Sequence, residues 1–252
     1  MKKFKHSGAF GDLIYSLPIV KHFGGGEFYV HLDQLNWIGQ HYYGSTPNPF
    51  HQGRFTAKDV ESLHGLLEAQ EYITKVDILD PQTTEVTHNL DRFRKPFVGH
   101  PGNYVDIYAD VFNVKDKETL RNTPWLTVPE VKHCGERTIA VNRTHRWIPT
   151  ELPSEWAGWK EEAAKECFFL GLPNEYEKFI KDTGWDIPYQ ETKDLLEMAQ
   201  YIAGADQYIG NQSVGLALAI GLGTQFLCEI RRDLPMERNE CYFPGHPKGE
   251  YF

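Results

Sequence analysis

Residues 207–223 carry the pattern that most restricts the fold of this chain. A β-type run, Gln207–Ile209, leads into Gly210 and three polar residues, and an almost uniformly apolar run then continues to Gly223. This pattern predicts a buried strand that leads into the N-terminus of a buried helix. Free backbone N–H groups and the positive end of the helix dipole meet at such a junction, so it favours phosphate binding. The pattern therefore indicates a nucleotide or nucleotide-sugar ligand.

Strand-like and helix-like segments alternate along both halves of the chain. Alternation of this kind predicts parallel sheets built from βαβ units, and therefore an α/β fold. The expected strands are 2–6, 27–32, 76–79, 138–141, 167–172, 187–189, 207–209 and 225–228. The expected helices are 12–22, 56–70, 104–112, 176–181, 192–204 with Thr192 as its cap, and 214–223. Residues 36–55 are expected to form a loop, and residues 240–252 show no helical pattern.

The pattern breaks near the middle of the chain. The segment Thr123–Pro129 contains two prolines, and the polar segment Lys132–Arg137 follows it. A chain of 252 residues is long enough for two modest hydrophobic cores. We therefore expect two Rossmann-like domains, residues 1–128 and residues 129–252, each built around its own parallel sheet.

The charge of the chain restricts its partners. The formal net charge of -9 argues against broad binding to nucleic acid or to an anionic membrane. Arg92, Arg94 and Lys95 form a local basic group, which leaves binding of nucleic acid at that one place open.

The cysteines and the hydropathy pattern indicate a cytoplasmic protein without integral membrane contact. The four cysteines are far apart and form no Cys-x-x-Cys pair, and no stretch approaches membrane-spanning length. The sequence also has no Asp-x-Asp pair, no P-loop motif and no Gly-x-Ser-x-Gly motif. We therefore expect chemistry that needs no metal ion and no cofactor.

The segment Ser7–Pro18 places two glycines and an aspartate at a strand-to-helix turn. Gly8 and Gly11 let the backbone approach a ligand closely, and Asp12 stands at the start of the expected helix. The helix dipole stabilises a carboxylate there, so Asp12 is a candidate general base. The alternative is that Asp12 is an ordinary N-cap aspartate.

The segment Val141–Pro149 follows the first expected strand of the second half. Open α/β sheets bind ligands at the carboxyl ends of their strands, which is where Arg143 and Arg146 stand. Guanidinium groups offer planar, multidentate donors that suit a diphosphate. The alternative is a solvated loop whose arginines pair with Glu151 or Glu155.

Asn211, Gln212 and Ser213 add polar side chains at the predicted phosphate-binding junction. They are candidate ligand contacts together with Gly210. The alternative is a polar, capped turn that binds no ligand.

Three motifs, in this order, resemble those of the ADP-heptose–lipopolysaccharide heptosyltransferase group, glycosyltransferase family 9. They are Gly11-Asp-Leu-Ile-Tyr-Ser-Leu-Pro18, Arg146-Trp147 with Pro149, and Ile209-Gly-Asn-Gln-Ser213; the segment Phe168-Phe-Leu-Gly-Leu-Pro173 also resembles a strand of that family. The resemblance implies the GT-B fold, in which two Rossmann-like domains face a cleft. It also implies that residues 1–128 bind the acceptor and that residues 129–252 bind the nucleotide-sugar donor.

The resemblance also implies roles for individual residues. Asp12 stands where the family has its catalytic base, and Arg146 where it has a basic residue that contacts the donor diphosphate. The expected donor-binding residues are Gly11, Arg143, Arg146, Gly210, Asn211, Gln212, Ser213 and Glu229, with Glu229 placed to bind a ribose hydroxyl. An inverting transfer without a metal ion is the implied reaction.

The chain departs from the family at the third motif, where Asn211-Gln212 replaces the more usual Asp-Thr. This difference indicates a donor other than ADP-heptose. The acceptor is left open among a glycan, a lipid-linked sugar, a protein and a modified nucleic-acid base. Two other classes of function are also left open: another nucleotide-sugar enzyme, such as an epimerase or hydrolase, and a non-catalytic nucleotide-sugar-binding module.

Overall fold

The computed structural model describes residues 1–32, 55–94, 102–146, 148–149, 151–235, 241–243 and 245–252. The chain forms two compact units, Met1–Arg121 and Asn122–Phe252. Trp125 and Leu126 are buried in the second unit, where both of their N–H groups donate to Gly221 O at 2.8 Å. The first unit therefore ends at Arg121, earlier than the domain boundary expected after Val128. The division of acceptor and donor binding between the two domains stays a prediction.

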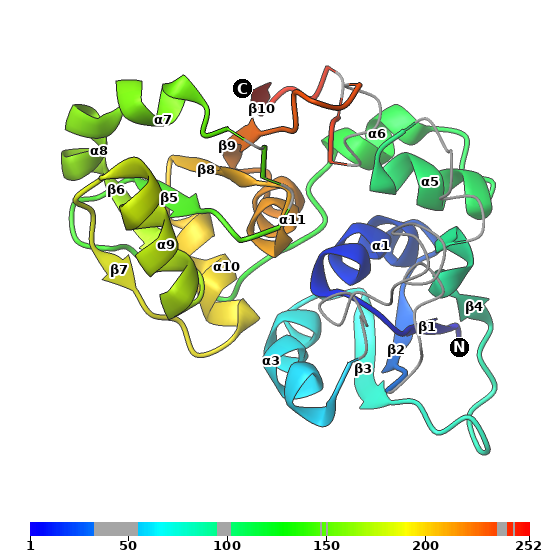
Figure 1. Cartoon of the computed structure of the whole chain (residues 1–252). Helices are drawn as coiled ribbons and strands as arrows, with labels where there is room; N and C mark the ends of the chain where they lie inside the picture. Colours follow the sequence, from blue (N-terminus) through cyan, green and yellow to red (C-terminus); the bar gives the residue numbers. More distant parts are fainter. Residues whose placement is uncertain (33–54, 95–101, 147, 150, 236–240, 244) are drawn as a thin grey trace, which may run out of the picture. The chain divides into compact units, whose positions relative to one another are not determined.

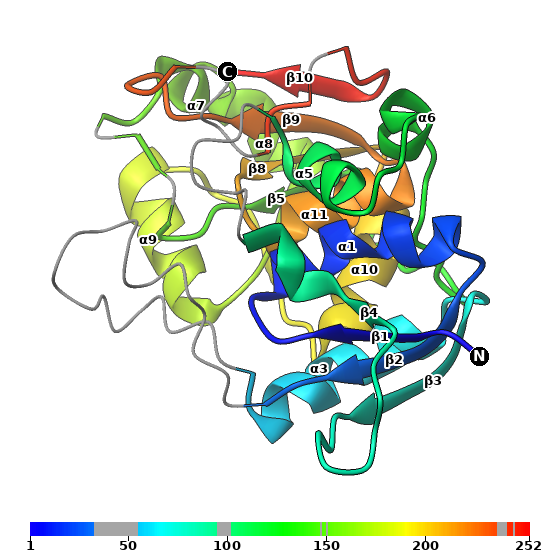
Figure 2. The ribbon, with the colours of Figure 1, turned by 90° about the vertical axis from the view of Figure 1, so that its right-hand side faces the viewer.

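The first unit is built on a parallel sheet (Figure 2), in which the described strands have the order β3-β2-β1-β4. Its elements are β1 (Lys3–His6), α1 (Phe10–His22), β2 (Gly26–Val30), α3 (Ala57–Glu68), β3 (Ile73–Ile78), β4 (His88–Asn89), the 3-10 helix η2 (Leu90–Phe93), α5 (Tyr104–Val111) and α6 (Lys117–Asn122). The residues Leu13–Val20, apolar except for Ser16, are all buried, and the helix contacts α5. A capping box formed by Thr56 and Asp59 begins α3.

The second unit is built on a larger parallel sheet (Figure 1), in which the described strands have the order β10-β9-β8-β5-β6-β7. Its elements are β5 (Ile139–Asn142), α7 (Ser154–Gly158), α8 (Lys160–Glu166), β6 (Cys167–Leu170), α9 (Pro173–Thr183), β7 (Tyr189–Gln190), α10 (Leu195–Ala203), β8 (Gln207–Asn211), α11 (Val214–Leu222), β9 (Gln225–Glu229) and β10 (Gly249–Tyr251). Parallel strands in two α/β units confirm the predicted fold class.

The buried helix expected after β8 is present as α11, whose residues Gly215–Gly221 are all buried. It contacts β8, β9 and α10, so its apolar surface is covered from several sides. Gly223 ends it in the left-handed conformation, with φ of 74°. On another part of the sheet, Trp156 packs against Phe179, Trp185 and Phe252 in an aromatic core.

Several element boundaries differ from the expected ones. Helix α10 begins at Leu195, and Asp194 caps it by accepting a hydrogen bond from Glu197 N–H at 2.8 Å, so Thr192 is not the cap. Helix α1 begins at Phe10, which places Gly11 and Asp12 inside its first turn. The last residues form a strand, β10, where no element was expected. Helices α7 and α8 were not expected either; they are short, and each buries one described residue.

Most of the expected loop at 36–55 lies outside the described residues, as do Lys95 of the basic group and Trp147 of the second motif. Within the described part of the chain, no helix has both the length and the apolar character needed to cross a membrane.

Candidate functional site

The predicted donor-site residues of the second unit lie at one edge of its sheet. Because the strands are parallel, their carboxyl ends share that edge, where open α/β sheets bind ligands. Asn142 ends β5 and the segment 143–146 follows it, the segment 171–175 follows β6, and the segment 211–213 leads from β8 into α11. Glu229 ends β9, directly opposite Asn211 in the register of the two strands.

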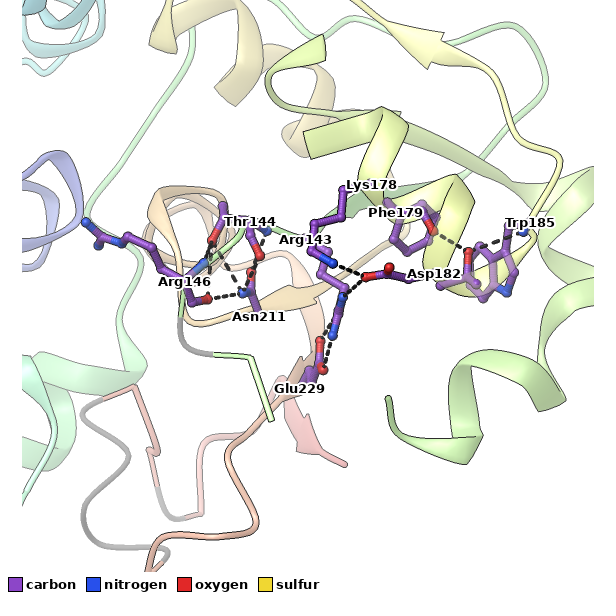
Figure 3. Close-up of polar contacts among 10 residues, drawn as sticks. Arg143, Thr144, Arg146, Lys178, Phe179, Asp182, Trp185, Asn211 and Glu229 are labelled. Carbon is purple, nitrogen blue, oxygen red and sulfur yellow. Dashed lines mark hydrogen bonds and ion pairs between the residues drawn. The ribbon is translucent and has the colours of Figure 1, made fainter. Parts of the chain in front are cut away.

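Asn211 is fully buried, and its amide binds the loop after β5 (Figure 3). Its Oδ1 accepts a hydrogen bond from Thr144 N–H at 3.0 Å, and its Nδ2 donates to Arg146 O at 2.5 Å. Nδ2 also lies 3.3 Å from Thr144 O and 3.3 Å from Thr144 Oγ1. The polar atoms of this side chain are therefore engaged by the chain's own backbone.

Ser213 also turns toward the protein. Its hydroxyl donates to Asn142 Oδ1 at 2.8 Å and forms no side-chain cap on α11. Asn142 Nδ2 in turn donates to Leu170 O at 2.8 Å, which ties β5 to β6. Because the Ser213 side chain does not cap the helix, the first-turn N–H groups of α11 rely on other partners.

Gln212 is buried, and its Oε1 accepts a hydrogen bond from Cys241 N–H at 3.3 Å. The side chains of Asn211, Gln212 and Ser213 thus all form hydrogen bonds to other parts of the protein. The contribution of the junction to an anionic ligand then rests on backbone N–H groups, since Gly210 carries no side chain.

Arg143 and Glu229 form a buried ion pair (Figure 3). Arg143 Nε donates to Glu229 Oε2 at 2.6 Å, and its Nη2 donates to Glu229 Oε1 at 2.9 Å. Arg143 Nη1 lies 3.3 Å from Asp182 Oδ2, and Lys178 Nζ donates to that same oxygen at 2.7 Å. This bidentate pair joins the ends of β5 and β9. The partners of Arg143 thus differ from Glu151 and Glu155, which were considered for a solvated loop.

Arg146 is exposed, unlike Arg143. Figure 3 shows its side chain extending away from Asn211, while its backbone oxygen accepts the Asn211 bond. Among the described residues, no carboxylate forms an ion pair with its guanidinium. Arg146 is therefore the arginine of this loop whose charge is available at the edge of the sheet.

Glu175, in the first turn of α9, is a polar residue of this edge that the motifs did not single out. Its Oε2 accepts a hydrogen bond from Leu172 N–H at 2.9 Å. Burial raises the pKa of its carboxyl, while that hydrogen bond and the charges of His145 and Arg146 oppose the rise. A Cβ added at Gly171, which has φ of 142°, would lie 2.9 Å from Glu175 Oε2 and 2.7 Å from Asn142 Nδ2, so glycine is required there. A glutamate just after a Gly-x-Pro turn that follows a strand is the sequence signal for such a residue.

In the first unit, Gly11 and Asp12 lie in the first turn of α1. A Cβ added at Gly11 would meet no atom within 4 Å, so the space beside the backbone is open there. Asp12 is held at two points: Tyr108 Oη donates to its backbone oxygen at 3.0 Å, and Arg94 Nη1 lies 3.3 Å from its Oδ2. The Arg94 guanidinium thus holds one oxygen of the Asp12 carboxyl at the start of α1.

The support behind Asp12 is a buried polar network. Gly8 N–H donates to His6 Nδ1 at 3.2 Å, and His6 Nε2 lies 2.9 Å from Tyr108 Oη. Burial is the main cause that lowers the pKa of His6 to about 3, so His6 is neutral. With Nδ1 accepting, Nε2 carries the proton and donates to Tyr108, whose own proton goes to Asp12 O.

The Arg94 guanidinium is buried over the ring of Phe93, 4.5 Å from its centroid, and it also lies 3.7 Å from Asp91 Oδ1. Lys5 Nζ lies 3.3 Å from Asp91 Oδ2. Arg94 therefore belongs to an internal group of charges around the turn before α1, while Arg92 lies over the Phe112 ring. The basic group expected at Arg92, Arg94 and Lys95 is thus divided, with Arg94 turned inward.

Three solved structures with similar folds are glycosyltransferases. A glycosyl transferase family 9 structure from Veillonella parvula matches with a TM-score of 0.61 and 11% identity, over 99% of this chain and 84% of that chain. E. coli heptosyltransferase WaaC with ADP matches with a TM-score of 0.50 and 13% identity, over 100% of this chain and 92% of that chain. The dodecameric iron-containing heptosyltransferase TibC from enterotoxigenic E. coli, in complex with ADP-D-beta-D-heptose, matches with a TM-score of 0.55 and 13% identity; this chain is covered over 98% and spans 62% of that one.

At these identities the similarity establishes a shared fold, and the predicted pair of Rossmann-like units, each with its own parallel sheet, is confirmed. No protein-family model matches the sequence, and no curated protein matches it significantly.

Proposed function

We propose that the protein is a glycosyltransferase that moves a sugar from a nucleoside-diphosphate sugar to an acceptor hydroxyl. The observation that carries this proposal is the gathering of the predicted donor residues at one edge of the six-stranded sheet, beside the N-terminus of α11. The fold supports it, because the three solved structures described above are glycosyltransferases and two of them hold ADP or an ADP-sugar.

The donor would bind through its diphosphate. In this proposal the backbone N–H groups that begin α11 and the exposed guanidinium of Arg146 hold the phosphates. Glu229 is fully buried and paired with Arg143, so the ribose contact expected of Glu229 is proposed instead for the partly buried Glu175. The carboxylate of Glu175 can accept hydrogen bonds from two sugar hydroxyls.

The acceptor would react through Asp12. Its carboxylate takes the proton of the acceptor hydroxyl as that oxygen bonds to the anomeric carbon, while the bond from that carbon to the phosphate oxygen breaks. The nucleoside diphosphate leaves with the electron pair, and Arg146 and the helix N-terminus stabilise its charge. Attack opposite the leaving group inverts the anomeric configuration.

We further propose that the reaction needs no metal ion and takes place in the cytoplasm. Arg146 and backbone N–H groups supply the positive charge that a metal would otherwise bring to the diphosphate. All four cysteines are free thiols, which suits a reducing compartment. The iron reported for TibC makes this a point to test directly.

The test begins with a thermal-shift panel of ADP, UDP, GDP and their sugar derivatives. A ligand that binds only the folded state raises the melting temperature by mass action, so the panel ranks the donors. Transfer is then measured with the best donor and a panel of glycan, lipid-linked, protein and nucleic-acid acceptors, with and without excess EDTA. The proposal fails if no nucleotide raises the melting temperature, and the metal-free mechanism fails if EDTA abolishes transfer.

Asp12→Asn tests the catalytic base. The amide cannot take the proton, so we expect kcat to fall by about 10³-fold while the nucleotide Kd changes by less than about twofold. Asp110→Asn, which makes the same change at the exposed end of α5, is the matched control and should keep full activity. Transfer by Asp12→Asn within threefold of the wild-type rate would remove Asp12 from the mechanism.

A further inference from the structure

The amide of Asn211 holds the loop that presents Arg146. One side chain, fully buried at the end of β8, accepts from Thr144 N–H and donates to Arg146 O, at 3.0 and 2.5 Å. Thr144 Oγ1 adds a contact to the loop itself, 3.4 Å from Arg146 N. These bonds fix the backbone on both sides of His145, and the Arg146 side chain leaves the loop in the other direction (Figure 3).

The chemistry of this contact requires an amide. The loop presents one N–H donor and two carbonyl oxygens to the side chain, so the partner must accept at one atom and donate at the other. A carboxylate can only accept, and would face Arg146 O and Thr144 O with a negative charge in a buried position. Asparagine meets the requirement, whereas aspartate, nearly identical in shape, does not.

From this geometry we propose that Asn211 is a positioning residue for the donor diphosphate, which it binds indirectly by holding Arg146 in place. The inference rests on the proposed function, because it takes Arg146 as the diphosphate contact. It also accounts for the Asn211-Gln212 departure from the usual Asp-Thr pair: both side chains bond to this chain's own backbone, at Thr144, Arg146 and Cys241. In this proposal the Asn211-Gln212 pair holds the chain's own backbone.

A double-mutant cycle with Arg146 tests this role. The probe is the best nucleoside diphosphate of the panel, and its Kd is measured by calorimetry for the wild type, Asn211→Asp, Arg146→Ala and the double variant. We expect Asn211→Asp to weaken binding by about tenfold or more at pH 8, and by less than about twofold when Arg146 is already alanine. An equal loss on both backgrounds would overturn the proposal, because Asn211 would then act independently of Arg146.

Gln225→Glu is the matched control. It makes the same amide-to-carboxylate change at the exposed start of β9, which is the amino end of that strand, away from the carboxyl ends where Asn211 lies. It should leave the nucleotide Kd within about twofold of the wild-type value. A tenfold loss in this control would attribute the effect to charge alone and would overturn the proposal.

Acid pH supplies a second readout that a merely structural defect would not show. A protonated carboxyl has one O–H donor and one carbonyl acceptor, as the amide does, so the affinity of Asn211→Asp should recover toward that of the wild type as pH falls from 8 to 5. Asn211→Ala carries no such group and should not recover. The other charged groups around this position, identical in both variants, are Arg143, His145, Arg146, Glu175 and Glu229. Parallel pH curves for the two variants would overturn the proposal.

The hold on the loop is also measured without a ligand. In Asn211→Ala the Thr144 amide loses its acceptor, so its hydrogen exchange should become at least about tenfold faster while amides of β5 stay protected. Unchanged Thr144 exchange would overturn the proposal even if nucleotide affinity fell. If no nucleotide binds the wild type, the proposed function fails, and the exchange rates alone then decide whether Asn211 holds the loop.

Discussion

Burial controls the charge of His6, and this has a consequence for stability. The ring is fully buried, and its neighbours include the charged groups of Lys5, Asp91 and Arg94. Desolvation outweighs the attraction of Asp91, so the pKa falls from 6.5 to about 3. The unfolded chain takes up a proton on this residue near pH 6.5, whereas the folded protein does not until about pH 3. The unfolded state therefore binds more protons between these values, and stability falls as the pH is lowered through this window.

We expect this residue to contribute about 1.6 kcal/mol to the loss of unfolding free energy between pH 6.5 and pH 5, because the slope is about half of 1.36 kcal/mol per pH unit at pH 6.5, where the unfolded residue is half protonated, and approaches the full value below it. His6→Gln does not titrate, so its stability should depend less on pH by about that amount, even if it is less stable at pH 7. Urea unfolding of both proteins at several pH values measures the difference. Parallel curves would contradict a neutral, buried His6.

Burial also determines the contacts of polar side chains at the donor edge, which is the edge of the six-stranded sheet where the carboxyl ends of its strands meet. A polar atom removed from water must find a partner, and the nearest partners of Asn211 and Ser213 are the loop after β5 and Asn142. Arg146, in contrast, stays exposed, and it is the side chain for which we propose the diphosphate contact. A buried polar side chain next to a predicted binding turn thus bonds to nearby groups of the protein and stabilises the turn.

At the scale of elements, the close approach of β5 and β8 shapes the donor edge. Gly210 on β8 is paired with Asn142 on β5. A Cβ added at Gly210 would lie 2.2 Å from Asn142 O and 2.4 Å from Tyr208 Oη, which is closer than side-chain atoms can approach. The two strands can therefore meet in this register only with glycine at this position.

Gly210→Ala should accordingly destabilise the protein by about 3 kcal/mol or more, because the clash involves backbone on one side and a buried tyrosine on the other. Gly158→Ala is the control: an added Cβ at the end of α7 meets no atom within 4 Å, and the change should be within about 1 kcal/mol of the wild type. Unfolding free energies from urea titrations measure both. Equal stability of Gly210→Ala and the wild type would show that the strands can separate without cost.

At the scale of the whole molecule, the proposed roles are divided between two compact units. Asp12 and Gly11 belong to Met1–Arg121, while the residues proposed to bind the diphosphate and the ribose belong to Asn122–Phe252. Each unit has its own parallel sheet and its own core. Under these proposed roles, nucleotide binding to Asn122–Phe252 can be measured without a transfer step, in which Asp12 of Met1–Arg121 would take part.

We therefore expect a nucleoside diphosphate alone to slow hydrogen exchange at residues 142–146, 171–175 and 210–216 of the intact chain, and to leave β1 and β2 unchanged. The reason is that a bound ligand suppresses the local opening of the segments that it contacts. Exchange followed by mass spectrometry on peptides from both units provides the measurement. Protection confined to Met1–Arg121 would place the nucleotide in the wrong unit.

The sequence by itself determined the architecture of this protein. Alternating strand and helix patterns predicted parallel α/β sheets, and the run through Gly210 to Gly223 predicted a strand followed by a buried helix, because periodicity and apolar content report on burial. The resemblance of three motifs predicted the fold that the solved structures share. Short elements such as β4, α7 and β10 were missed, since few residues carry their pattern.

Only the tertiary structure decided what each polar residue of the candidate site does. Sequence patterns treated Arg143 and Arg146 alike, yet Glu229, 86 positions along the chain from Arg143, pairs with that arginine and leaves Arg146 exposed. They likewise placed Asn211 beside a ligand, whereas its amide bonds to a loop 65 positions away. The physical reason is that burial makes each polar atom depend on whichever partner the fold brings near, and such partners come from distant parts of the chain.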